Sequence, residues 1–401
     1  VANMGTDGIV AVDPVDGTVE RKIKTGRGAH QIFPSPDGRL LYVNNRVDGT
    51  TTALDAATLE HVRTYSVPGG PDCIDFAPDG KLWITQRFIQ KLGVLDPATG
   101  EPGLRNNTFT NVMAAWTLAG DMREVHHRWH DAWLTGALDG TGPFGPRVGF
   151  RWWRFATGVL LGLSLSVKWS GLYYIMFFGL LSSFWDLFLR RRYGVEKPIA
   201  GTLLRDVPPA LASLVLVPVV LYLWSWRAWF ASETSVYRHS LSDGTIAGSE
   251  WPWLENLPEP VAGWLYYHLS VLKFHASLTS SSGHHHPWDS KPWAWLVSAR
   301  PILYYSATDI ECGNGGTCRE MIYLFGTPAI WWLVIPAVLW GLWSLIIRRN
   351  RAFLIPLVGF AAGFLPWLAA FDRQMYFFYA TAFIPFVIVL IALALGQLIG
   401  H

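Results

Sequence analysis

Long apolar segments separated by charged clusters dominate the chain after residue 150. Most of them approach 20 residues, the length with which a helix crosses the hydrocarbon core of a bilayer. The first segment is shorter, and we expect it to form a helical hairpin with the second. The pattern therefore predicts a membrane domain over residues 151–401 with about six spans: 155–167, 172–189, 207–224, 323–347, 352–371 and 376–399.

The first 105 residues follow a different pattern, in which short alternating strands are separated by turns. Asp13, Asp55 and Asp96 recur at intervals of about 42 residues, and the turn Pro36-Asp37-Gly38 returns as Pro78-Asp79-Gly80. A period near 40 residues is typical of β-propeller blades of about four strands each. This segment is therefore expected to form an incomplete propeller of about two and a half blades, with open sheet edges.

Composition changes along the chain in the same way, because 21 of the 22 tryptophans lie at or after Trp116. The predicted fold class is mixed: a polytopic α-helical membrane protein preceded by an incomplete all-β propeller fragment. Residues 106–150 are interpreted as a junction and a cytoplasmic segment. The net charge of +2 averages two unlike halves and indicates no nucleic-acid partner.

Positive charge predicts the orientation of the spans, because basic loops face the cytoplasm. Counting spans from the basic clusters places the loop 230–320 outside the cytoplasm and the C-terminus inside it. With no span predicted before the first cluster, the blades are expected on the cytoplasmic face. The clusters contain Arg147, Arg151, Arg154, Arg190, Arg191, Arg192, Lys197, Arg205, Arg348, Arg349 and Arg351.

Three polar features are expected on the extracytoplasmic face: the turn at Lys168, the region 268–293 and the turn at Asp372–Gln374. Within the second feature, residues 263–278 alternate aromatic and aliphatic positions with His268, Lys273 and His275 at helical spacing. A helix that lies in the membrane interface fits this pattern.

The consecutive histidines at 284, 285 and 286 raise the hypothesis of a metal site. Adjacent histidines in a loop point in different directions, and no HExxH spacing accompanies them, so no metal is predicted. Of the three cysteines, Cys312 and Cys318 are close enough in sequence to close a small loop, and whether they form a disulfide stays open.

Recognition of a phosphorylated lipid is a second hypothesis for the same face. Lys168, Lys291 and Arg373 are then candidates to neutralise a phosphate. The indole rings of Trp288, Trp293 and Trp295 would form the walls of the site, because tryptophan faces stack on sugar rings. The residues by themselves leave open the alternative that these cations extend to the interface and the tryptophans form an aromatic belt.

The stretch HHHPWDSKPWAWL at 284–296 resembles the H-P-[YW]-[ED]-S-[KR]-P-W-x-W loop of protein O-mannosyltransferases, membrane enzymes of the GT-C class and glycosyltransferase family 39. The resemblance extends from about residue 120 to the C-terminus and is to the actinobacterial members. LLYVNN at 40–45 resembles YVTN/NHL-type propeller repeats. Further matching segments are 145–174, 229–239, 274–293, 326–332 and 372–386.

The resemblance implies transfer of mannose from polyprenyl phosphate mannose to Ser or Thr hydroxyls of exported proteins, in the cell membrane. An acidic residue then acts as general base while the lipid phosphate leaves. No cofactor is implied beyond the lipid-linked donor, and nothing in the sequence requires a divalent cation. The implied substrate-binding residues are Lys168, His286, Trp288, Asp289, Ser290, Lys291, Trp293, Arg373 and Gln374.

The chain departs from the family at its N-terminal half, where members carry the catalytic acidic pair in their first extracytoplasmic loop. Here the propeller repeats occupy that place, so the catalytic residue is unknown, with Asp289 as a secondary candidate because of its compartment. We expect a truncated or fused mannosyltransferase, joined to the propeller fragment around residues 101–120. The alternative is a membrane-anchored β-propeller that binds a partner without catalysis.

Overall fold

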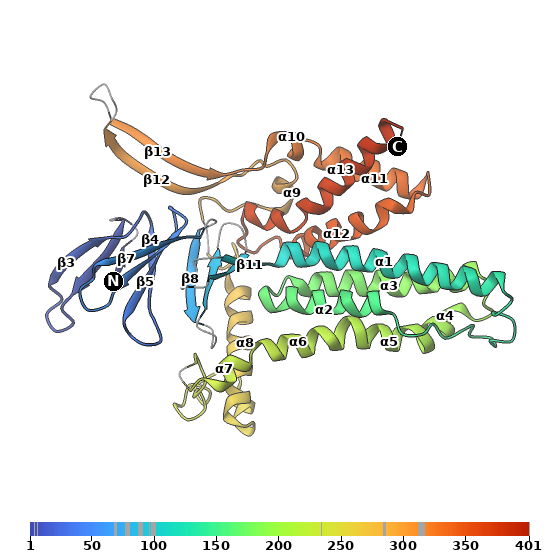
Figure 1. Cartoon of the computed structure of the whole chain (residues 1–401), viewed down its shortest axis with the longest axis horizontal. Coiled ribbons are helices and arrows are strands. Elements are labelled where there is room, and N and C mark those ends of the chain that lie inside the picture. The colour runs from blue at the N-terminus through green and yellow to red at the C-terminus, as the bar shows by residue number, and fades with distance from the viewer. Residues whose placement is uncertain are drawn as a thin grey trace.

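A β-rich N-terminal part is followed by a helical part in the computed structural model of this chain (Figure 1). The structure describes residues 1–401 apart from 4, 6, 68–69, 77–80, 87–90, 96, 98–101, 234, 284–285, 312–316 and 401. The predicted mixed fold class is confirmed, because β-sheets precede a set of apolar helices long enough to cross a membrane.

The N-terminal strands form three antiparallel sheets in which neighbours in sequence pair with each other, as in propeller blades. The first sheet contains β1 (Ala2–Asn3), β2 (Gly8–Val12) and β3 (Val19–Lys24). The second contains β4 (Ala29–Pro34), β5 (Leu40–Asn45), β6 (Thr50–Asp55) and β7 (His61–Ser66). The third contains β8 (Pro71–Phe76), β9 (Leu82–Gln86), β10 (Lys91–Leu95) and β11 (Pro102–Asn106).

The repeated aspartates close the turns after equivalent strands. Asp13 Oδ1 accepts a hydrogen bond from the backbone N of Val15 at 2.7 Å, and Asp55 Oδ1 accepts from the backbone N of Thr58 at 2.8 Å. A carboxylate that hydrogen-bonds its own backbone two or three residues on stabilises a tight turn. The interval between these turns therefore reflects blade geometry. The other repeated positions, Asp96 and Pro78-Asp79-Gly80, lie outside the described residues.

The helical part contains a bundle and two flanking elements. Its first helices are α1 (Asn107–Leu134), α2 (Trp152–Val167), α3 (Gly171–Arg192), and a continuous helix over Pro198–Ala231 that comprises α4 to α7. The later elements are α8 (Glu259–Ser277), α9 (Pro292–Trp295), β12 (Ile302–Glu311), β13 (Thr317–Leu324), α10 (Pro328–Trp331), α11 (Val334–Ile346), α12 (Leu354–Ala369) and α13 (Ile384–Leu398). Short 3-10 helices at Arg351–Phe353 and Phe377–Ala382 precede α12 and α13.

Four helices of the described chain are long and apolar enough to cross a membrane: Gly171–Arg192, Pro198–Ala231, Pro328–Ile346 and Arg351–Ala369. The other two predicted spans are shorter, since α2 has 16 residues and α13 has 15. The predicted span 323–347 also begins too early, because β13 continues to Leu324. Apolar composition alone did not separate the end of that strand from the start of the helix.

The helix over 198–231 contains two π-helical segments, Thr202–Asp206 and Ala212–Leu216. Each is followed closely by proline, Pro208 and Pro209 after the first and Pro218 after the second. Proline lacks the backbone N–H of the regular helical ladder, and a wider turn accommodates its ring. The second segment packs against α2 at Gly158, where an added Cβ would lie 1.8 Å from the carbonyl oxygen of Ser213.

Helix α1 takes up a large part of residues 106–150, which the sequence predicted to be a junction and a cytoplasmic segment. It begins directly after β11 and packs along α2 and α3 (Figure 1). The blades and Arg147 consequently lie at opposite ends of the bundle, whereas the sequence predicted them on one face of the membrane. The charged residues Asp121, Arg123 and Glu124 had hidden this helix from a search for apolar segments.

Two elements extend from the end of the bundle that carries the blades. Helix α8 crosses the end of α6 (Val217–Ser225) (Figure 1). Its His268 Nε2 lies 2.7 Å from the hydroxyl of Tyr222, which accepts a hydrogen bond from Trp169 Nε1 at 2.8 Å.

Strands β12 and β13 form a hairpin that the sequence did not predict. Cys318 is disulfide-bonded, and Cys312 lies outside the described residues.

Candidate functional site

The three polar features predicted to converge do meet at one end of the bundle. Backbone hydrogen bonds join the loop after α8 to the turn before the last helix, from Ser280 N to Asp372 O at 2.9 Å and from Gln374 N to Leu278 O at 2.8 Å. Ser290 N donates to Met375 O at 2.8 Å. Segments about 90 residues apart are thus held side by side by their main chains.

Asp289 fastens the loop to the turn. Its Oδ1 accepts a hydrogen bond from Met375 N at 2.8 Å, and its Oδ2 lies 2.9 Å from Lys291 Nζ. The ammonium group of Lys291 also donates to the carbonyl oxygen of Arg373 at 3.2 Å. Both carboxylate oxygens are engaged, and Lys291 is largely neutralised by its partner. This geometry favours a positioning role for both residues.

Lys168 and Arg373 share one aromatic ring. Lys168 Nζ lies 5.0 Å from the ring centroid of Tyr379, and Arg373 Cζ lies 6.0 Å from the same centroid. Arg373 Nη2 also lies 3.0 Å from Nδ1 of His275. A ring face attracts cations, so Tyr379 holds two positive groups together that would otherwise repel each other. The result is a local excess of positive charge at the end of the bundle.

The environment of this cluster lowers the pKa of two of its members, Lys168 and His275. Burial, together with the positive charge of Arg373, lowers the pKa of Lys168 to about 8. Burial also lowers the pKa of His275, with added repulsion from Arg373 and Lys168. The positive charge of Arg373 thus contributes to the lowered pKa of both Lys168 and His275, which indicates a site that an anion would stabilise.

A polar pocket of about 350 Å³ lies beside the cluster. Trp293 is 57% exposed, so its ring is accessible to a ligand. The ring of His286 lies edge-on to Tyr376 at 5.3 Å, and its Nδ1 accepts a hydrogen bond from Trp288 N at 3.1 Å. The lining is polar with one large aromatic face, which suits a sugar. It consists of His286, Asp289, Lys291, Trp293, Ala294 and Arg300.

The remaining predicted residues have supporting positions. Trp288 packs edge-on against Tyr323 at 5.9 Å, and Ser290 is 1% exposed. Gln374 joins the site through its backbone. Trp295 was expected to form a wall of the site, but it is fully buried and donates a hydrogen bond from Nε1 to Ser290 O at 3.1 Å. It belongs to the core beneath the site.

Sequence reasoning missed three residues that the structure adds to the site: His275, Arg300 and Tyr379. His275 lies in a segment that carried the resemblance, but its spacing from Arg373 in sequence gave no signal of contact. In the part of the chain that the structure describes, no group of three or more His, Cys, Asp or Glu is arranged to hold a metal ion. Two of the three consecutive histidines, 284 and 285, lie outside that part.

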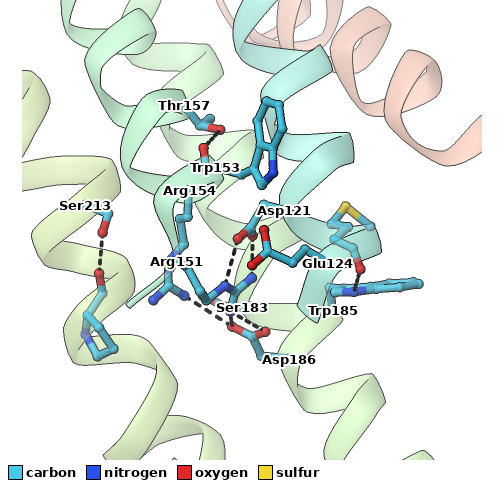
Figure 2. Close-up of polar contacts among 12 residues, drawn as sticks. Asp121, Glu124, Arg151, Trp153, Arg154, Thr157, Ser183, Trp185, Asp186 and Ser213 are labelled. Carbon is cyan, nitrogen blue, oxygen red and sulfur yellow. Dashed lines mark hydrogen bonds and ion pairs between the residues drawn. The ribbon is translucent and has the colours of Figure 1, made fainter. Parts of the chain in front are cut away.

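A buried ion network occupies the opposite end of the bundle (Figure 2). Arg151, which precedes α2, donates from Nε to Asp121 Oδ1 at 2.8 Å and from Nη1 to the Asp186 oxygens at 2.7 and 2.8 Å. Arg154 Nη1 lies 3.4 Å from Asp186 Oδ2. All four side chains are at most 5% exposed. Two arginines and two aspartates therefore join α1, α2 and α3 in an electrically balanced cluster.

A second buried pair lies at the same end, where Arg190 Nη2 donates to Asp206 Oδ1 at 2.8 Å and to Pro146 O at 3.1 Å. Arg151, Arg154 and Arg190 were expected as charges that set membrane orientation, and the structure instead places them inside the protein. Exposed cations remain at this end, namely Arg147, Arg191, Arg192, Lys197, Arg348 and Arg349.

Comparison with known proteins finds two families in one chain. Residues 1–123 match the model of the YNCE-like beta-propeller, and residues 260–399 match the C-terminal four TMM region of protein-O-mannosyltransferase. Both resemblances inferred from the sequence are confirmed by these matches. A chain of Kuenenia stuttgartiensis hydrazine synthase matches 25% of this chain and 30% of its own length at 20% identity, with a TM-score of 0.24, too low to carry an argument.

Curated relatives share one description, polyprenol-phosphate-mannose–protein mannosyltransferase. That of Corynebacterium glutamicum is 62% identical over 80% of this chain and 59% of its own length. That of Mycobacterium tuberculosis is 43% identical over 73% of this chain and 56% of its own length. That of Mycolicibacterium smegmatis is 42% identical over 72% of this chain and 55% of its own length. The chain thus spans a little over half the length of these relatives.

Proposed function

We propose that this chain forms the donor-binding part of a protein mannosyltransferase that uses polyprenyl phosphate mannose. The observation that carries the proposal is the pair of cations, Lys168 and Arg373, held over Tyr379 beside a polar pocket. The names of relatives up to 62% identical support the choice of donor. If the helices only anchored a binding propeller in the membrane, the cluster of Lys168, Arg373 and Tyr379 would have no function.

The donor fits the site in three parts. The phosphate lies between Lys168 and Arg373, and the mannose occupies the pocket against Trp293. The polyprenyl chain follows an apolar groove of about 740 Å³, whose lining includes Val167 and Trp169 on either side of Lys168. Each part of the ligand then contacts groups of matching polarity. No cofactor is needed, and the proposal includes no divalent cation.

Transfer breaks the bond between the sugar and the phosphate oxygen, and the Ser or Thr hydroxyl of an exported protein attacks the sugar carbon. Lys168 and Arg373 stabilise the charge that develops on the leaving phosphate. Asp289 positions Lys291 and the backbone at Met375 through its two engaged oxygens. A carboxylate that acts as general base accepts the hydroxyl proton, and none of the residues named above takes that role.

The orientation follows from the basic residues. The end of the bundle with Arg191, Arg192, Arg348 and Arg349 faces the cytoplasm, because positive loops are retained there. The donor site and the blades then face the outside, together with the loop 230–320. Helix α13 ends on the cytoplasmic side.

Direct binding tests the proposal. The purified chain in lipid nanodiscs is titrated with radiolabelled polyprenyl phosphate mannose, and we expect saturable binding that unlabelled polyprenyl phosphate displaces. Polyprenol without phosphate is the matched competitor and should displace weakly, because it offers nothing to the two cations. Binding that polyprenol displaces as well as polyprenyl phosphate, or no saturable binding at all, would remove the basis of the proposal.

The pH dependence of donor binding follows from Lys168. A lysine is charged below its pKa, so with a pKa of about 8 the group is mostly charged at pH 7 and mostly neutral at pH 9. A bound phosphate favours the charged form, and donor affinity should therefore fall about tenfold from pH 7 to pH 9. Arginine stays charged throughout this range, so Lys168→Arg should flatten the profile. An equal slope in both proteins would exclude Lys168 as its source.

A further inference from the structure

A groove of about 510 Å³ runs along the bundle between α1, α3, α12 and α13, and its polar end lies toward the end of the bundle opposite the donor site. One face of α1 forms its floor, with Val112, Ala119 and Arg123 among the lining residues. These positions are spaced by seven and four residues, so they lie along one side of the helix. The apolar part, from Val112 to Met122, runs about 15 Å along the helix axis.

The groove is polar at one end only. Arg123 and His126 of α1 meet Arg351, which precedes α12, and the described lining contains no Asp or Glu. The titratable and charged groups that act on His126 are Arg192, Arg351, His127 and His130. All of these are cationic or become so on protonation. This end of the groove is therefore strongly suited to an anion.

Two observations show how this end is built. The Nε2 atom of His126 is buried without a hydrogen-bond partner among the described residues. Arg351 Cζ lies 4.4 Å from the ring centroid of Phe188 and 5.5 Å from that of Trp185. The indole of Trp185 is itself held by a hydrogen bond of 3.0 Å from Nε1 to Met122 O (Figure 2). The guanidinium thus lies over a fixed aromatic platform at the mouth of the groove.

We propose that this groove binds one anionic phospholipid of the membrane leaflet that contacts the basic end of the bundle. The phosphate lies among Arg123, Arg351 and His126, and an acyl chain lies along the apolar face of α1. Charge complementarity selects the phosphate, and the continuous apolar floor selects a lipid over a free anion. A polar head joined to a long apolar body matches the groove in one molecule. This site is distinct from the proposed donor site and does not depend on it.

Lipid retention tests the inference. The full chain is purified in mild detergent, and the affinity for added phosphatidylglycerol is measured by native mass spectrometry, with phosphatidylcholine as the zwitterionic comparison. We expect one phosphatidylglycerol bound per chain and phosphatidylcholine bound at least about tenfold more weakly, because the cationic end of the groove repels the choline group of phosphatidylcholine. The double variant Arg123→Gln with Arg351→Gln loses the charge-assisted hydrogen bonds to the phosphate. That double variant should show the same loss for phosphatidylglycerol.

Matched variants keep the test decisive. Arg348→Gln with Arg349→Gln removes the same charge at the same end of the bundle outside the groove lining, and should retain wild-type affinity. Ala119→Phe fills the groove without changing charge and should abolish binding while the protein remains monodisperse. Equal retention in the groove and control variants, equal binding of both lipids, or displacement by millimolar inorganic phosphate would each overturn the inference. An unaltered lipid affinity in Ala119→Phe would do so as well.

Discussion

Replacement of Arg151 by methionine is expected to destabilise the folded chain by about 3–5 kcal/mol, the typical effect of removing one partner from a buried ion network. Arg151 contacts both Asp121 and Asp186, whereas Arg154 contacts only the second in the described structure. Without Arg151, Asp186 keeps a cation at 3.4 Å and Asp121 stays buried opposite an uncharged side chain. The free energy of unfolding, measured by titration with dodecyl sulfate, reports the loss.

Two further variants separate charge imbalance from lost packing. Asp121→Leu combined with Arg151→Met removes one positive and one negative group, so most of the stability should return. Arg128→Met breaks an exposed pair with Glu124 on the same helix and should change stability by less than about 0.5 kcal/mol. If the Asp121→Leu combination were no more stable than Arg151→Met alone, an unpaired carboxylate could not explain the loss.

Joint replacement of Lys168 and Arg373 by glutamine is expected to weaken donor binding by about 100-fold or more. Each substitution removes a charge-assisted contact to the phosphate, and each such contact contributes about 1.5–3 kcal/mol. The single variants should each lose about tenfold or more by the same reasoning. Titration of labelled polyprenyl phosphate mannose into nanodiscs that contain each variant measures the change.

The control for this prediction is Lys273→Gln on α8. Lys273 belongs to α8, which lies at the same end of the bundle, but it forms an exposed pair with Glu250 at 2.7 Å. Its removal lowers the positive charge of that face by the same amount as either single variant, without touching Tyr379. Donor affinity should stay within about twofold of wild type. A comparable loss in Lys273→Gln would show that general surface charge, and not the pair over Tyr379, binds the donor.

The membrane part illustrates what periodicity and apolar length can predict. Helices α3 and α12 follow from long segments almost without charge, since such segments are stable only away from water. Helix α1 packs against both of these helices but carries Asp121 in its middle. The cost of burying that carboxylate is offset by Arg151, thirty residues later in sequence. No local pattern contains that pairing. The hairpin β12–β13 was missed, and the apolar end of β13 was assigned to the next helix because only Phe325, Gly326 and Thr327 separate the two elements.

The candidate site, too, was predicted only in part from the sequence. The resemblance of the loop at 284–296 identified the segment, and the basic side chains of Lys168 and Arg373 identified the chemistry. Which cations would face a phosphate was decided by contact: Lys291, which looked equivalent to the others in sequence, is neutralised by Asp289. Trp295, one of three similar tryptophans, is buried, and Trp293 is exposed. His275 and Tyr379 entered the site only through the folded arrangement.

By itself, the amino-acid sequence determined that this protein joins propeller repeats to a polytopic membrane domain, because turn chemistry, strand period and apolar length are local properties. It also determined where the polar segments lie along the chain. The tertiary structure decided that α1 runs along the bundle, so that the blades and the candidate site share one end. It decided as well which charges are paired, because the free energy of a buried charge depends on its partner in space.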